Sequence, residues 1–153
     1  MSTSLQPPVK FEELCISWSE DATIDITNLT QENSRIPKLH AKYLTILSHH
    51  RLIVNRLDAE YRELKSIKWQ YYNGDMNNPE DLAEYGFEPL LKTILKQNIP
   101  IYLESDKDLN KLLLKRAMHQ EIVDYCTMII RELNNRTYQI GNMIKQEIFL
   151  SGG

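Results

Sequence analysis

The residues that most clearly suggest a chemistry lie between Arg62 and Gly74. Three cations and three large aromatic side chains occur there within one short stretch: Arg62, Lys65, Lys68, Trp69, Tyr71 and Tyr72. Cationic side chains neutralise phosphates without reading sequence, and aromatic faces stack on any unpaired base. The combination suits single-stranded nucleic acid better than a duplex groove. The structural alternative is that these aromatic residues belong to a core, and we expect Tyr71 to be buried.

A second cationic pattern precedes this stretch. Arg35, Lys42, His49 and Arg56 recur every seven residues. They could form a row of phosphate contacts, or the edge of a helical interface that bonds acids on a neighbouring helix. Both interpretations stay open. The sequence therefore predicts a nucleic-acid-binding set drawn from both patterns: Lys65, Lys68, Arg62, Trp69, Tyr72, Arg56 and Lys42.

Motifs for catalysis or cofactor binding are missing from the sequence. It has no phosphate-binding glycine loop, no nucleophile elbow and no HExxH zinc motif. His49 and His50 are adjacent, so on a helix they point about 100° apart and cannot readily share a metal. Asp106 and Asp108 fit a helix cap better than a pair of catalytic acids. We expect no enzyme, no cofactor and no metal site; a small metal-dependent enzyme built on the histidines is the least favoured alternative.

Composition and charge define the class of protein. The chain has 153 residues, of which 42% are hydrophobic and 25% charged, as in a soluble globular protein. Its net charge of -3 arises from four blocks of -5, +5, -5 and +2, which divide after residues 34, 72 and 110. A polyanion would find one attractive segment, residues 35–72. Cys15 and Cys126 are expected to be reduced, and the sequence predicts neither a membrane span nor a signal peptide.

The elements that would position these residues are helices. From Leu39 to Tyr71, eight of ten positions spaced alternately by four and three residues are apolar or aromatic, which predicts a long heptad seam. Pro37 suits its first turn and separates it from a possible helix over 25–35. Asn73-Gly74 should end it.

Shorter elements are expected on either side. Phe11, Leu14 and Trp18 favour a short helix or a docking arm, and residues 74–89 are predicted to form an exposed acidic loop. A short helix should follow around Leu90–Leu95 and end by Pro100, before an extended or buried segment over 101–103. A second long helix, capped by Ser105, is predicted from there on, with a possible break at Asn134-Asn135.

The ordered set of these residues resembles the UvsY family of recombination mediators from T-even-like phages. The similarity begins near Ile24-Asp25 and runs through Tyr71-Tyr72-x-Gly74. It returns at Asp106-Lys107-Asp108 and continues through Asp124-Tyr125-Cys126, Arg136 and Ile140. The acidic loop of this chain is about eight residues longer than in the family, and residues 1–20 are unmatched. The family's DNA-binding motif, Lys-Ala-Arg-Leu, falls on Ser66, Ile67, Lys68 and Trp69, so only its second cation is kept.

The resemblance implies an all-α protein with long amphipathic helices. It implies an N-terminal helical bundle that binds single-stranded DNA, residues 1–104, and a C-terminal helical oligomerisation segment, residues 105–153. It also implies a homo-oligomer, a hexamer or heptamer ring, and no catalytic activity. The implied partners are single-stranded DNA, a RecA-like phage recombinase of the UvsX type, and the phage single-strand-binding protein.

The predicted function is that of a recombination mediator, which binds single-stranded DNA and promotes loading of the recombinase onto strands covered by single-strand-binding protein. The implied location is the cytoplasm of the infected bacterial host. The alternative is a helical coiled-coil adapter without nucleic-acid binding. Such an adapter has no need of a basic segment between two acidic ones, whereas a DNA-binding protein does.

Overall fold

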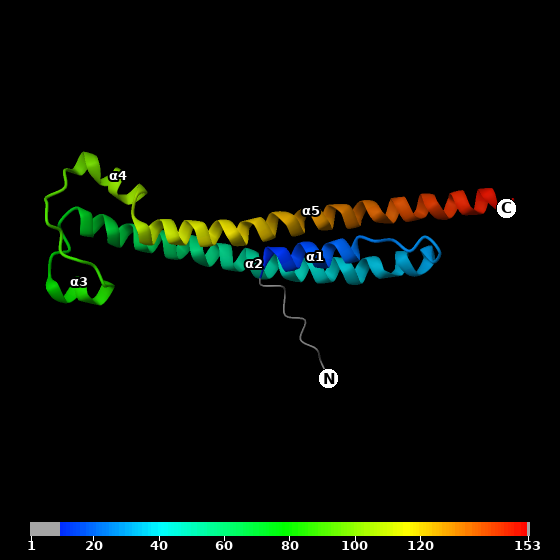
Figure 1. Ribbon diagram of the computed structural model, residues 1–153, viewed down its shortest axis with the longest axis horizontal. Helices are drawn as coiled ribbons and strands as arrows, with labels where there is room; N and C mark the ends of the chain where they lie inside the picture. The colour runs from blue at the N-terminus through cyan, green and yellow to red at the C-terminus, as the bar shows by residue number, and fades with distance from the viewer. Residues whose placement is uncertain (1–9, 153) are drawn as a thin grey trace, which may run out of the picture. The chain divides into compact units, whose positions relative to one another are not determined.

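The computed structural model describes residues 10–152, and within them all regular structure is helical (Figure 1). The elements, in chain order, are α1 (Phe11–Asp21), α2 (Leu29–Tyr72), α3 (Pro79–Tyr85), the 3-10 turn η1 (Lys96–Asn98), α4 (Ile99–Glu104) and α5 (Lys107–Leu150). The all-α prediction with long amphipathic helices is confirmed. The expectation about a signal peptide falls largely on residues 1–9, which lie outside the described residues.

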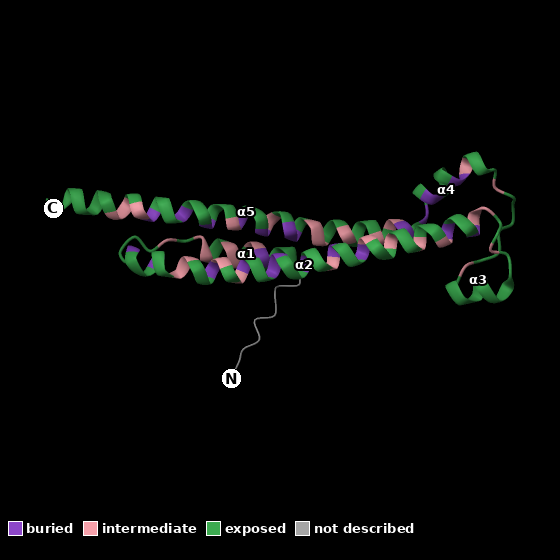
Figure 2. Cartoon of the chain, turned by 180° about the vertical axis from the view of Figure 1, so that it is seen from behind, coloured by how far each residue is buried: buried purple, intermediate pink, exposed green. Residues whose placement is uncertain are grey.

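The residues of the predicted seam lie on the buried side of α2. Six of its ten positions are buried: Leu39, Tyr43, Ile46, His50, Leu57 and Tyr71. Figure 2 shows buried positions recurring along α2 and α5. Glu60, the charged member of the seam, is exposed, so it lies on the surface of the helix and not in the core. Burial of Tyr71 is confirmed.

The predicted start of α2 was wrong. The helix begins at Leu29 and continues through Pro37. Asn28 caps the first turn, since its side-chain oxygen accepts a hydrogen bond from the N–H of Gln31. Pro37 is exposed, and the helix loses one backbone hydrogen bond there without ending. Packing of the flanking seam residues outweighs that local cost.

The acidic segment is more ordered than predicted. Within it, α3 has Asn78 at its N-cap and Pro79 in its first turn, and Gly86 ends it with a left-handed φ of 71°. The expected helix at Leu90–Leu95 was wrong, because that segment has no helical turn. Pro100 lies in the first turn of α4, a position proline tolerates. The segment 101–103, predicted to be extended or buried, is helical, and Leu103 within it is buried.

The second long helix is present as predicted, but its N-cap and its continuity differ from the prediction. Asp106 caps α5: its Oδ1 accepts hydrogen bonds from the N–H groups of Asp108 and Leu109, each at 3.0 Å. The sequence assigned capping to Ser105 as well as to Asp106 and Asp108, and in the structure Asp106 is the N-cap. The helix does not break at Asn134-Asn135. Both asparagines are exposed, and their modest propensity cost, about 0.7 kcal/mol each at most, is offset by the buried residues beside them.

The chain forms two compact units. Of the described residues, the first contains 10–53 and 118–152 and buries Leu14, Tyr43 and Ile129 among others. The second contains residues 54–117 and has a core of Ile99, Leu103 and Leu109. Both long helices contribute to both units. The predicted functional division after residue 104 stays a prediction, and it does not coincide with these units.

Candidate nucleic-acid interface

The second unit presents a cationic and aromatic face on α2. Arg62, Lys65 and Trp69 are spaced by three and four residues, so they lie on one side of the helix. All three are exposed, and Trp69 keeps 42% of its surface accessible. The Lys65 ammonium lies 5.9 Å from the centre of the Tyr61 ring. We call these three residues the cationic face of α2; it can offer two charges to phosphates and one indole to a base.

Lys68, the cation that matches the family motif, is placed differently. It is buried, with 5% of its surface accessible. Its Nζ lies 2.8 Å from Asp108 Oδ2 and 3.1 Å from Asp106 Oδ2. The same ammonium lies 4.0 Å from the centre of the Phe87 ring. Two carboxylates and an aromatic face therefore satisfy Lys68, and this structural role differs from the predicted phosphate contact.

Tyr72, which is half-buried, contacts the same cluster. Its hydroxyl donates a hydrogen bond of 2.5 Å to Asp106 Oδ2. Burial raises the pKa of Tyr72, and its bond to the Asp106 carboxylate raises it further. Burial would raise the pKa of Asp106, but the hydrogen bonds from Tyr72, the Leu109 N–H and Lys68 outweigh it and lower that pKa. Asp106 thus joins α2 to the start of α5 within the second unit.

The Lys68 ammonium stays charged in this setting. Burial would lower its pKa, but hydrogen bonds to Asp108 and Asp106 outweigh that effect, so its pKa is raised. The cluster of Lys68, Asp106 and Asp108 holds one positive and two negative charges. Its net charge is negative, so as a group it does not attract a phosphate.

The other two predicted cations do not join the cationic face. Arg56 is six residues before Arg62, so it points about 120° away around the helix. It pairs with Glu60 of the same helix at 3.8 Å. Lys42 belongs to the first unit, where its Nζ lies 2.6 Å from Asp21 Oδ2 and 2.8 Å from Ser17 Oγ.

The seven-residue stripe matches the helical-edge interpretation at two positions. Arg35 and Lys42 both pair with Asp21 of α1, at 3.8 and 2.6 Å. Burial would raise the pKa of Asp21, but hydrogen bonds from Lys42 and Tyr43 outweigh it, so the pKa is lowered. These cations therefore hold α1 against α2 within the first unit, and their charge is largely neutralised there.

A groove of about 530 Å³ lies on another side of the second unit. Sequence reasoning did not identify it. Its aromatic residues, Tyr85 and Phe87, stack with ring centres 5.5 Å apart. Lys111 and Lys115 also line it, but so do three acids: Glu60, Glu63 and Asp108. The mixture of charges gives this groove no net attraction for a polyanion.

Two of the four histidines lie against each other. His50 and His119 are paired through their Nδ1 atoms, 2.9 Å apart, with stacked rings. Over residues 10–152, no group of three or more His, Cys, Asp or Glu side chains is placed to hold a metal ion. In that same part of the chain no helix is long and apolar enough to cross a membrane.

The sequence profile of one family matches residues 17–153. That family is described as "Recombination, repair and ssDNA binding protein UvsY". The chain belongs to the UvsY family. The description names recombination, repair and DNA binding, and no catalytic reaction. No curated protein sequence matches the chain.

Solved structures show the same fold. Three crystal structures of the bacteriophage T4 recombination mediator protein UvsY superpose with TM-scores of 0.80, 0.76 and 0.78, each at 20% sequence identity. They cover 94%, 92% and 90% of this chain, and 99%, 98% and 98% of the T4 chains. The helical arrangement of the UvsY family is therefore present over nearly the whole chain, although four of five residues differ.

Proposed function

We propose that this protein is a recombination mediator that binds single-stranded DNA through the cationic face of α2. The observation that supports this most directly is the exposure of Arg62, Lys65 and Trp69 on one side of a helix in a chain of the UvsY family. The two cations contact successive phosphates without reading sequence. The indole of Trp69 stacks on an unpaired base, which a duplex does not offer.

One face of this size binds DNA weakly, so the proposal includes a homo-oligomer. Two phosphate contacts and one stacked base give low affinity per protomer. A hexamer or heptamer ring repeats the face, and effective concentration converts weak contacts into tight binding along one strand. Ile148, Phe149 and Leu150 at the end of α5 are 54%, 80% and 75% exposed. Apolar side chains so exposed support an interface between copies near that end.

The mediator role follows from wrapping a strand around repeated faces. Such binding competes with the phage single-strand-binding protein for the same phosphates and holds the strand for a RecA-like recombinase of the UvsX type. The protein itself performs no chemical step. We place this activity in the cytoplasm of the infected bacterial host. The alternative, a helical adapter without DNA binding, is favoured by the ion pairs that occupy Lys42, Arg56 and Lys68.

The test is binding of a labelled oligothymidine to the full chain as a function of salt. Fluorescence anisotropy should show affinity falling as salt rises, because each neutralised phosphate releases counterions. Each phosphate-binding cation that is removed should reduce the logarithmic slope by about 0.7. Arg62→Ala with Lys65→Ala should therefore weaken binding and flatten the slope, and Trp69→Ala should weaken binding without changing the slope.

One matched control and one measurement of assembly size complete the design. Lys38→Ala with Arg51→Ala removes two exposed cations of α2 in the first unit and should leave the slope unchanged. Light scattering of the full chain should report several protomers. The proposal would be contradicted if the full chain did not bind the oligonucleotide in dilute buffer. It would also be contradicted if the chain bound the strand while light scattering showed a single protomer.

A further inference from the structure

Tyr102 of α4 is an exposed aromatic residue outside the cationic face of α2. It keeps 44% of its surface accessible, close to the 42% of Trp69. Its ring centre lies 5.6 Å from that of Tyr72, and the two rings are inclined at 44°. Tyr72 follows Trp69 by three residues, so their side chains are neighbours on the surface of α2. Tyr102 therefore lies near the Trp69 end of the cationic face.

The packing of α4 fixes Tyr102 in this position. Leu103 belongs to the apolar core of the second unit, and Tyr61 and Tyr72 of α2 pack against that core. Tyr61 also has the Lys65 ammonium over its ring. The same two tyrosines thus contact the core to which α4 contributes and adjoin the cationic face. Because Tyr102 precedes the buried Leu103, it is held at the edge of that face.

Tyr72 is a rigid support for the Tyr102 ring. The Tyr72 hydroxyl donates a hydrogen bond of 2.5 Å to Asp106 Oδ2. Asp106 is itself buried and paired with Lys68. Tyr102 therefore rests on an anchored ring while much of its own surface is accessible. An aromatic side chain that is ordered before binding loses little rotamer freedom when a base stacks on it.

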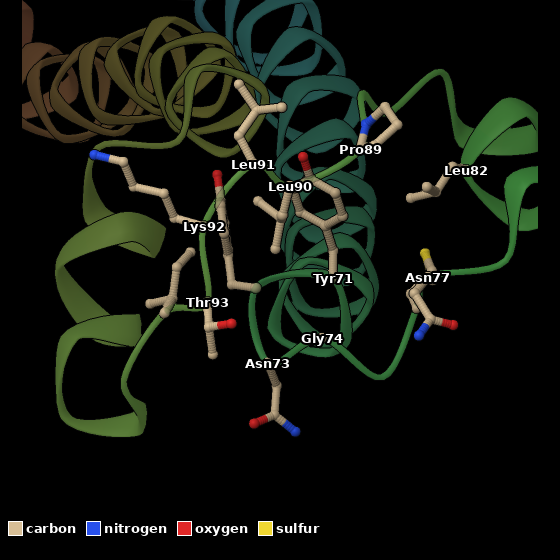
Figure 3. Close-up of a pocket in the computed structure, with 13 residues that line it drawn as sticks. Tyr71, Asn73, Gly74, Asn77, Leu82, Pro89, Leu90, Leu91, Lys92 and Thr93 are labelled. Atoms are coloured by element: carbon tan, nitrogen blue, oxygen red, sulfur yellow. The ribbon is translucent and has the colours of Figure 1, made fainter.

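The charges around Tyr102 do not oppose a polyanion. A hollow of about 390 Å³ lies beyond the end of α2, and Tyr72 and Lys92 are among the residues that line it (Figure 3). None of the described residues in this lining is acidic. Glu104 is exposed, but it is two positions after Tyr102 and points about 160° away around α4.

We propose that Tyr102 stacks a second unpaired base, next to the base on Trp69, so that each protomer holds two bases of one strand. The inference rests on the proposed function, since it places the strand along the cationic face of α2. It narrows the ligand to a strand that offers exposed bases as well as phosphates. Aromatic stacking tolerates every base, so Tyr102 adds affinity without adding sequence preference.

The test compares binding of two labelled strands of equal length to the full chain: oligothymidine and an abasic analogue that keeps every phosphate. Tyr102→Ala should weaken oligothymidine binding about fivefold or more. The salt slope should stay the same, because no phosphate contact is removed. Tyr102→Phe should bind like the original chain, since stacking needs the ring and not the hydroxyl. None of these variants should change binding of the abasic strand.

Two further variants control for packing and for exposure. Tyr102→Leu keeps an apolar contact with Tyr72 but has no aromatic ring, so it should weaken oligothymidine binding as Tyr102→Ala does. Tyr85 is 42% exposed in the same unit and stacks on Phe87, but it lines the groove of mixed charge. Tyr85→Ala should therefore leave binding unchanged.

The inference is overturned if Tyr102→Ala and Tyr102→Leu bind oligothymidine within about twofold of the original chain. It is also overturned if they weaken binding of the abasic strand equally, or if Tyr85→Ala has the same effect. Weaker binding by Trp69→Ala together with unchanged binding by Tyr102→Ala removes only this inference. A full chain that does not bind oligothymidine at all removes the proposed function, and this inference with it.

Discussion

Replacing Lys68 with methionine should destabilise the fold and leave the proposed DNA contacts intact. Methionine keeps an apolar stem of similar length but removes the ammonium that lies between Asp106 and Asp108. Asp106 is 5% exposed, so its carboxylate would keep the Tyr72 hydroxyl and the α5 N–H groups but would have no positive charge beside it. The Asp108 carboxylate is 60% exposed and can turn to water.

The magnitude follows from this difference in burial. Breaking a buried ion pair by removing one partner costs about 3–5 kcal/mol. Because one of the two carboxylates reaches solvent, the lower end applies, about 3 kcal/mol. The ammonium also lies 4.0 Å from the centre of the Phe87 ring, and removing that interaction adds to the cost. In urea, a destabilisation of about 3 kcal/mol moves the unfolding midpoint down by about 1–3 M.

The assay is urea unfolding followed by circular dichroism, beside oligothymidine binding in dilute urea-free buffer. Lys65→Met is the matched control: the residue type is the same, but Lys65 is exposed, so its free energy of unfolding should change by less than about 0.5 kcal/mol. Asp106→Asn in the Lys68→Met background should restore part of the missing stability, since it removes the unpaired charge.

The two lysine substitutions should therefore have opposite effects on stability and on DNA binding. Lys68→Met should unfold at lower urea yet keep the salt slope of DNA binding, and Lys65→Met should do the reverse. If Lys68→Met unfolds with the same midpoint as Lys65→Met while the salt slope flattens, Lys68 contacts DNA and the structural role argued for it is refuted.

Two further predictions concern the same helices. The pKa of Asp106 is lowered in the folded state, so its stabilisation is present above about pH 4 and should be lost as pH falls through the folded-state pKa; the pKa of Lys68 is raised, so its stabilisation should be lost only as pH rises past about 10.5. Urea unfolding across pH should show both losses, and an Asp106→Asn variant that keeps the whole acid-side loss would contradict the assignment. Separately, Pro37→Ala should restore the backbone hydrogen bond missing inside α2 and raise the free energy of unfolding by about 1–3 kcal/mol. A thermal midpoint that falls in that variant would show that Pro37 is needed for packing.

Local sequence patterns determined much of the fold. The alternation of four and three residues from Leu39 predicted the buried edge of α2, because helical periodicity alone places such residues on one face. Helical spacing also puts Arg62, Lys65 and Trp69 on one side of α2, but the sequence prediction selected them by residue type and did not separate them from Lys68. Local rules failed at Pro37, where packing along a long seam outweighed a breaker that would end a shorter helix.

Only the tertiary structure decided which cations of α2 remain exposed, so that a phosphate could reach them. Lys65 and Lys68 are the same residue type, three positions apart in one basic segment, and composition gave no reason to separate them. The two lysines differ in burial and pairing because Asp106, 38 positions after Lys68, lies at the start of another helix and faces Lys68. Helical spacing determines which residues share a side of α2, but it cannot say which side the acids of a distant helix will meet. A buried lysine whose charge such acids neutralise cannot contact a phosphate. A lysine on the exposed side of the helix can.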